Sequence, residues 1–133
     1  MDDVAGELVR RANRTIELFS DISKIDFGFN RQSVEWIEGY IERMRERADF
    51  NDGTWNGLID TLGSFVGQCI LARAGGSWAL ADDDRGWGIL LPSDTFAFPI
   101  NKVAKQFRSG LAEGESILGF YDLCVDRLAQ RRP

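Results

Sequence analysis

The chain has 133 residues, of which 44% are hydrophobic and 28% are charged, with a formal net charge of −5 and no histidine. This length and composition are typical of one soluble globular domain that buries a core of its own. The lack of histidine excludes Ser-His-Asp and Cys-His catalysis as well as histidine-ligated zinc and haem. The net charge of −5 argues against nucleic acid as a partner, since duplex binding relies on clustered lysine and arginine.

The most apolar long stretch, residues 55–72, is interrupted by Asn56, Asp60 and Gln68, so no membrane span is expected. The start "MDDVAGELVRRANR" is acidic and then polar, unlike a secretory signal. These features predict a cytoplasmic protein without membrane contact. Residues 1–133 are expected to form a single domain, in which the helix of residues 1–20 either packs on the core or lies at its periphery.

The first predicted helix runs from Asp2 to about Phe19, because its apolar residues recur every three or four positions. In the following stretch, "SDISKIDFGFN", the residues Ile25, Phe27 and Phe29 alternate with aspartate and glycine. This alternation predicts an extended piece, strand-like or irregular, that docks on the domain with one side buried.

Ser33 is predicted to be the N-cap of the second helix, with Glu35 in its first turn. Apolar residues at helical spacing form one side of this helix: Val34, Trp36, Ile37, Tyr40, Ile41 and Met44. The stretch "FNDGT" is then expected to break the chain at Gly53.

The third helix is predicted from Thr54 to Arg73, with a wide apolar face that indicates the centre of the domain. Gly63 and Gly67 lie four residues apart on one face, which favours close approach of another backbone over the membrane-dimer use of the same spacing. The pair Gly75–Gly76 is expected to end the helix.

Two short strands, "SWALA" and "GWGILL", are predicted around the turn residues "DDDRG". Trp78 and Trp87 are expected to be neighbours across this hairpin. The aspartates at 82–84 are compatible with a cation site and with a solvated loop tip. The loop is favoured, because the spaced ligands and closing glutamate of a calcium loop are missing.

The run "TFAFPI" is predicted to add a third strand, which Pro99 ends. A fourth helix is expected over residues 100–109, with Lys102, Lys105 and Arg108 on its outer side and Gly110 as its stop. A last helix is expected over residues 114–130. Helices before and after a small antiparallel sheet of two to three strands make the predicted fold class α+β.

The two cysteines, Cys69 and Cys124, both fall on apolar helical faces. Without histidines they do not make a zinc site of the usual spacing. Buried thiols are favoured over a disulfide, because unpaired cysteines are commonly buried in cytosolic proteins.

The segments "IDFGFNRQSVEWIEGYIERMR", "LGSFVGQCILARAGGSW", "WGILL" and "FAFPINKVAKQFRSGLAEGESILGFYD", in this order, resemble a group of small bacterial proteins of unknown function. The group shares a G-x-x-x-G helix, a GG-x-W hairpin entry, an FP-x-x-K-V-x-K segment and a C-terminal helix with Ser-Ile and Phe-Tyr. The resemblance covers Ile25 to Asp122 and implies a bacterial cytosolic fold. The group often carries Glu where this chain has Gln68, which leaves that position without an implied role. Analogy with small bacterial proteins that accompany secreted toxins suggests an immunity or accessory role.

No pair of acids stands out for acid-base catalysis, and "GGSW" lacks the spacing of a phosphate-binding loop. We therefore assign no catalytic residue, cofactor or metal and interpret the chain as a non-enzymatic domain that binds another protein, with self-association left open. The expected partner-binding surface combines aromatic area with positive charge: Trp78, Arg85, Trp87, Lys102, Lys105 and Tyr121.

Two alternatives stand beside this interpretation. The same lysines could instead serve a small-ligand or anion-binding module, or they could simply face solvent while the tryptophans lie in the core. Residues 51–100 carry six acids against two bases. This acidic middle either faces a cationic partner, as in toxin neutralisation, or is an ordinary solvated surface.

Overall fold

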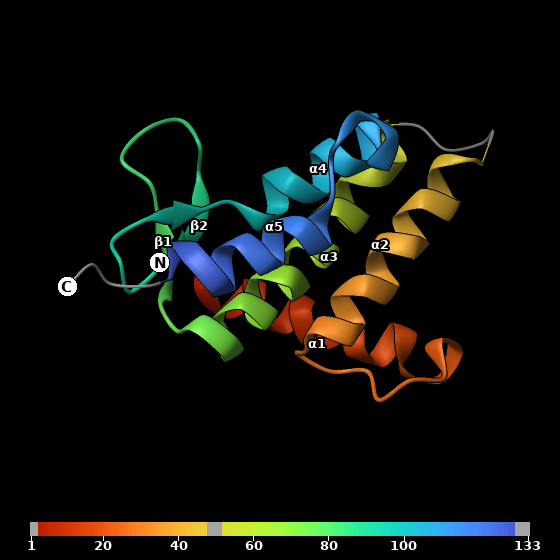
Figure 1. Ribbon diagram of the computed structural model, residues 1–133, viewed down its shortest axis with the longest axis horizontal. Coiled ribbons are helices and arrows are strands. Elements are labelled where there is room, and N and C mark those ends of the chain that lie inside the picture. The colour runs from red at the N-terminus through yellow and green to blue at the C-terminus, as the bar shows by residue number, and fades with distance from the viewer. Residues whose placement is uncertain (1–2, 48–51, 130–133) are drawn as a thin grey trace.

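The computed structural model describes residues 3–47 and 52–129 (Figure 1). Within them, α-helices precede and follow a three-stranded antiparallel sheet, so the predicted α+β class is confirmed. The elements are α1 (Val4–Ser23), α2 (Arg31–Arg45), α3 (Asp52–Ala74), β1 (Ser77–Leu80), β2 (Trp87–Leu90), β3 (Phe96–Ala97), α4 (Pro99–Ser109) and α5 (Ile117–Leu123). A 3₁₀ turn (Leu111–Glu113) precedes α5, and a π-helical turn (Cys124–Leu128) continues it.

Helix α3 is the centre of the molecule, as its wide apolar face predicted. It packs against α1, α2, α4 and α5, and the β1–β2 hairpin lies at one end of the helices (Figure 1). Its fully buried residues include Leu62, Phe65, Val66, Cys69 and Ile70. Gly53, which was predicted to break the chain, lies inside α3, because the helix already begins at Asp52.

Helix α1 begins at Val4 with Asp3 as its N-cap, since the Asp3 carboxylate accepts a hydrogen bond from the Gly6 N–H at 2.9 Å. It extends through Ser23, four residues beyond the predicted end, and closes on Lys24 in the left-handed conformation (φ 58°). The loop that follows is irregular, and Phe27 in it is buried, so the prediction of a docked segment is confirmed. The segment was predicted to start at Ser20, but α1 continues to Ser23.

The N-cap of α2 is Asn30 and not Ser33. The Asn30 Oδ1 accepts hydrogen bonds from the Ser33 N–H at 2.9 Å and from the Ser33 hydroxyl at 2.8 Å. The Ser33 hydroxyl in turn accepts a bond from the Gly28 N–H at 3.0 Å. Both residue types can cap a helix, and the cap falls on Asn30 because its backbone is extended (φ −142°, ψ 167°).

Gly63 and Gly67 admit a close neighbour, as predicted. A Cβ placed on Gly63 would lie 2.5 Å from the Ile100 Cα at the start of α4. A Cβ placed on Gly67 would lie 2.3 Å from the Trp78 ring of β1. The two glycines therefore set the distance at which α4 and the hairpin pack on α3.

The sheet has the order β1-β2-β3, and both pairs of strands are antiparallel. Its register places Ile89 opposite Trp78 and Leu80 opposite Trp87. The two tryptophans are thus diagonal and not directly paired, because the loop length between the strands sets the register.

The C-terminal helix starts later than predicted. Gly114 closes the 3₁₀ turn in the left-handed conformation (φ 82°), and Ser116 is the N-cap of α5, with its hydroxyl accepting a bond from the Gly119 N–H at 3.0 Å. The Glu38 carboxylate of α2 accepts further bonds from the Ser116 hydroxyl at 2.5 Å and from the Leu118 N–H at 3.3 Å. A carboxylate at this helix start is favoured by the exposed N–H groups and the helix dipole.

Candidate functional site

Of the six residues predicted to bind a partner, three line one pocket and a fourth lines a different pocket. Arg85, Lys102 and Lys105 line the first pocket, whereas Tyr121 lines the second. Trp78 and Trp87 line neither of these two pockets.

We call the first cavity the basic pocket; its volume is about 630 Å³. It lies where the end of the hairpin, β3, α4 and the C-terminal helix meet. Its lining residues are Arg85, Phe96, Ala97, Phe98, Asn101, Lys102, Ala104, Lys105, Arg108, Phe120 and Leu128. Arg108 was predicted to lie on the outer side of this helix but was not included in the predicted partner-binding surface, and neither were Phe98 and Phe120, although Arg108 follows Lys105 by three positions and so shares its helix face.

Arg85 is held at the rim of the basic pocket. Its guanidinium lies 4.5 Å from the centre of the Phe98 ring, a cation–π contact. The Arg85 Nε donates to both carboxylate oxygens of Asp83, at 2.9 and 2.8 Å. Hydrogen bonds from the Arg85 side chain and backbone hold the pKa of Asp83 below its ordinary value. The loop thus presents Arg85 in one orientation, stacked on an aromatic wall.

Lys102 is not on the outer side of α4, where the helical pattern placed it. Its Nζ lies 2.6 Å from the Glu115 Oε2, and its side chain is only 21% exposed. The hydrogen bond from Lys102 lowers the pKa of Glu115, with smaller contributions from the charges of Lys102 and Lys105. The correction has a tertiary cause, since Glu115 comes from the turn that precedes α5.

Lys105 and Arg108 are the exposed cations of the basic pocket. Neither makes an ion pair within 4.0 Å with any residue in the described ranges 3–47 and 52–129. With Arg85 paired to Asp83 and Lys102 paired to Glu115, these two side chains give the pocket an excess of positive charge. This excess stands out in a chain whose net charge is −5.

Trp78 has a structural role instead. Its Nε1 donates a 2.8 Å hydrogen bond to the Gln68 Oε1, and its ring lies against Gly67. The bond gives Gln68 a role in holding the hairpin on α3, which the sequence could not assign.

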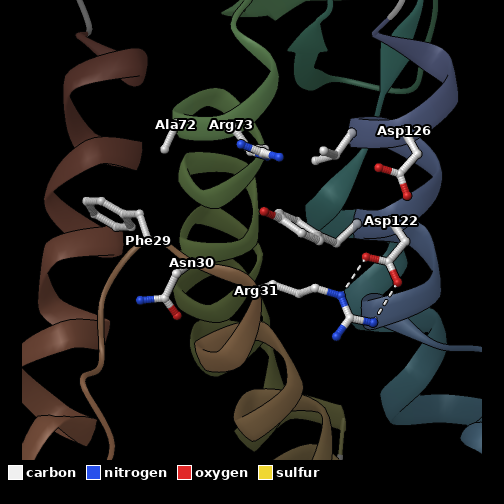
Figure 2. Close-up of a pocket in the computed structure, with 9 residues that line it drawn as sticks. Phe29, Asn30, Arg31, Ala72, Arg73, Asp122 and Asp126 are labelled. Carbon is white, nitrogen blue, oxygen red and sulfur yellow. Dashed lines mark hydrogen bonds and ion pairs between the residues drawn. The ribbon is translucent and has the colours of Figure 1, made fainter.

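We call the second cavity the tyrosine pocket (Figure 2); its volume is about 590 Å³. It lies between the loop before α2, the last turn of α3 and the C-terminal helix. Its lining residues are Phe29, Asn30, Arg31, Ala72, Arg73, Tyr121, Asp122, Val125 and Asp126. Arg31 and Asp122, both in this lining, form a bidentate ion pair. The Arg31 Nε donates to the Asp122 Oδ1 at 2.9 Å, and the Arg31 Nη2 donates to the Asp122 Oδ2 at 2.8 Å.

The Arg31–Asp122 pair predicts a pH dependence of stability. The hydrogen bond from Arg31 lowers the pKa of Asp122 below its ordinary value of 3.8. The stabilisation by the Arg31–Asp122 pair is therefore fully present above the pKa of Asp122 in the unfolded chain, about 3.9. It is lost as the pH falls through the lower pKa that Asp122 has in the folded protein. We expect Asp122→Asn to lower the free energy of unfolding at neutral pH, and the gap to the wild type to close near about pH 2. Urea unfolding at both pH values measures this. A gap that is equally large in acid would contradict it, and Asp60→Asn, at an exposed position of α3, is the control.

The aspartates at 82–84 are exposed in the loop between β1 and β2. No group of three or more His, Cys, Asp or Glu side chains that could hold a metal ion occurs in the described part of the chain. Cys69 and Cys124 are buried and unbonded to each other, as predicted. Burial raises the pKa of Cys124 to about 12 and that of Cys69 further, so neither thiol is a reactive thiolate near neutral pH.

Two further observations bear on the class of protein. Among residues 3–47 and 52–129, no helix combines the length and the apolarity needed to cross a membrane. No family model, curated protein or solved structure matches the chain. The resemblance to small bacterial proteins stays a prediction.

Proposed function

We propose that this protein is a non-enzymatic, cytoplasmic binding domain whose basic pocket receives an acidic segment of a partner protein. The observation that carries the proposal is the lining of that pocket, which combines four bases with aromatic rings and contains no acid among the residues that the structure describes. Only two of the four bases form an ion pair with a described residue, Arg85 with Asp83 and Lys102 with Glu115. The resemblance and analogy given above make a bacterial immunity protein or an accessory subunit the concrete form of this proposal.

The geometry supports binding in two ways. Lys105 and Arg108 are spaced three residues apart on the exposed side of α4, so both can reach one acidic segment. Phe98 and Phe120 supply apolar area beside them, and Phe98 is held by its stacking with Phe96, whose ring centre lies 5.6 Å away. Aromatic rings next to arginine are the usual anchors of protein interfaces.

A small anionic ligand is the second candidate, and the size of the basic pocket favours it. Its volume of about 630 Å³ lies within the range of small-molecule sites, roughly 300–1,000 Å³. The same two cations, Lys105 and Arg108, would hold the anion. A ligand of this kind would raise the thermal stability of the protein without any partner protein present.

The test reverses the two exposed charges with Lys105→Glu and Arg108→Glu in one variant. Affinity capture from the native lysate, followed by mass spectrometry, is expected to retain a stoichiometric partner on the wild type and to retain it at least about tenfold less on this variant, because like charges repel across an interface. Lys102 is left unchanged, since reversing it would break its pair with Glu115 and confuse folding with binding.

The control is Arg10→Glu with Arg14→Glu, two exposed arginines one turn apart on α1 that do not line the basic pocket. Their ion pairs with Glu7 and Glu17 are exposed on both sides and contribute little to stability, unlike the half-buried pair of Lys102 with Glu115. It carries the same change of net charge. Loss of the partner from the pocket variant but not from the control supports the proposal. Equal capture by all three proteins, or equal loss from both variants, contradicts it.

A further inference from the structure

Tyr121 lines the tyrosine pocket with a mostly buried ring, and its hydroxyl is open to the cavity and lacks a protein partner in the part of the chain that the structure describes. Tyr121 is 4% exposed, and its hydroxyl makes no hydrogen bond to any residue of the described chain. Burial raises the pKa of this hydroxyl, while the positive charge of Arg73 acts in the opposite direction. The hydroxyl therefore keeps its proton at neutral pH and can donate a hydrogen bond into the pocket.

Two other polar side chains around this cavity, Asn30 and Arg31, are already engaged. The Asn30 side chain caps α2 through its Oδ1 and donates from Nδ2 to the Asp26 carbonyl at 3.2 Å. Arg31 is bound by both oxygens of Asp122. These bonds hold two walls of the pocket in place and leave the Tyr121 hydroxyl free to bind a ligand.

Arg73 is the second available donor. It lies in the last turn of α3 and faces the helix that carries Asp122 and Asp126 (Figure 2). It makes no ion pair within 4.0 Å to a residue that the structure describes. A guanidinium and a phenol hydroxyl that line one cavity form a set of donors suited to a carboxylate, whose oxygens accept from both.

The remaining walls limit what else can enter. Phe29, Ala72 and Val125 are apolar and can cover the body of a small molecule. The negative charges of Asp122 and Asp126 balance the positive charges of Arg31 and Arg73. A dianion is therefore expected to bind here more weakly than a ligand with a single carboxylate. The volume of about 590 Å³ again suits a small ligand. Val125 and Asp126 lie on the π-helical turn, a feature that recurs at functional sites.

We infer that the tyrosine pocket is a second binding site, for a small monocarboxylate with an apolar body, in which Tyr121 and Arg73 hold the carboxylate. This site is separate from the basic pocket, and it does not depend on the partner-binding function proposed above.

The test is an NMR titration with 3-phenylpropionate, using the side-chain Nε–H signals of the arginines. The Nε–H signal of Arg73 is expected to shift as 3-phenylpropionate is added, until the site is saturated. Arg73→Gln should weaken binding at least about tenfold, and Tyr121→Phe, which keeps the buried ring, should weaken it about three- to tenfold through loss of one hydrogen bond. The neutral 3-phenylpropanamide and the dianion phenyl phosphate should bind at least threefold more weakly than the carboxylate.

Arg108→Gln is the control, because it removes a similar charge from the basic pocket only. It should leave the affinity unchanged. Three results would overturn the inference: equal affinity for the carboxylate and the amide, unchanged affinity in Arg73→Gln, or a loss of affinity in Arg108→Gln alone. Thermal unfolding of each variant keeps a folding defect from being mistaken for lost binding.

Discussion

Gly63→Ala is expected to lower the free energy of unfolding by about 3 kcal/mol, near the upper end of the usual cost of overpacking a core. The added methyl group would lie 2.5 Å from the Ile100 Cα, a backbone atom that cannot swing aside as a side-chain end could. Relief would require α4 to move away from α3, which would also disturb the packing of Val103 and Phe107. Urea unfolding at equilibrium, with an unchanged slope against denaturant, measures the loss.

Gly57→Ala is the matched control in the same helix. A Cβ there meets nothing within 4 Å, and the position is exposed. Replacing glycine with alanine inside a helix then stabilises by about 0.5–1 kcal/mol, because the unfolded chain loses freedom. The two substitutions should therefore have opposite signs. If Gly63→Ala were neutral or stabilising, the close packing of α4 on α3 would be wrong.

Gln106→Leu is expected to lower the free energy of unfolding by about 3 kcal/mol, the second large effect. Gln106 is fully buried on α4. Its Oε1 accepts the Ile117 N–H at 2.8 Å, and its Nε2 donates to the Glu42 Oε2 at 3.0 Å. Leucine fills much the same volume but leaves a buried N–H without a partner and a carboxylate with one donor fewer, and both changes are costly.

The control for this prediction is Gln32→Leu, an exposed glutamine on α2, which should change the free energy of unfolding by less than about 0.5 kcal/mol. Gln106→Glu gives a second measure through pH. Burial beside Glu42 raises the pKa of the introduced carboxyl, so its penalty grows as the pH rises above the unfolded-state value of about 4.3. A loss that is larger at pH 5 than at pH 8 would contradict the buried bond to Glu42.

Much of the fold could be predicted from local pattern. Apolar residues at helical spacing located α2, α3 and α4, because a helix in a small domain must turn one side to the core. Gly75, Gly76 and Pro99 marked the ends of elements, since glycine and proline act through their own backbone geometry. Most errors lay at helix starts such as Asn30, where a second residue three positions later, Ser33, is an equally good cap by type, and one lay at the end of α1.

The candidate sites were predicted less well, for a physical reason. Lys102 was expected to face solvent, but its exposure depends on Glu115, which lies 13 residues away in sequence. Gln106 was overlooked as a buried residue, although it follows Val103 by three positions, because glutamine is seldom buried without partners from other elements. The spacing of residues along one helix carries no information about such partners.

The sequence by itself determined the α+β class, the central helix with its paired glycines, the hairpin and the lack of any histidine-based chemistry, because these follow from residue types and short-range spacing. Only the tertiary structure decided which charges remain unpaired. In the tertiary structure Arg85 of the hairpin loop lies with the bases of α4 in the basic pocket, and Tyr121 lies with Arg73 in a separate cavity. Ion pairing and burial are set by contacts between residues distant in sequence, and those contacts exist only once the elements have packed.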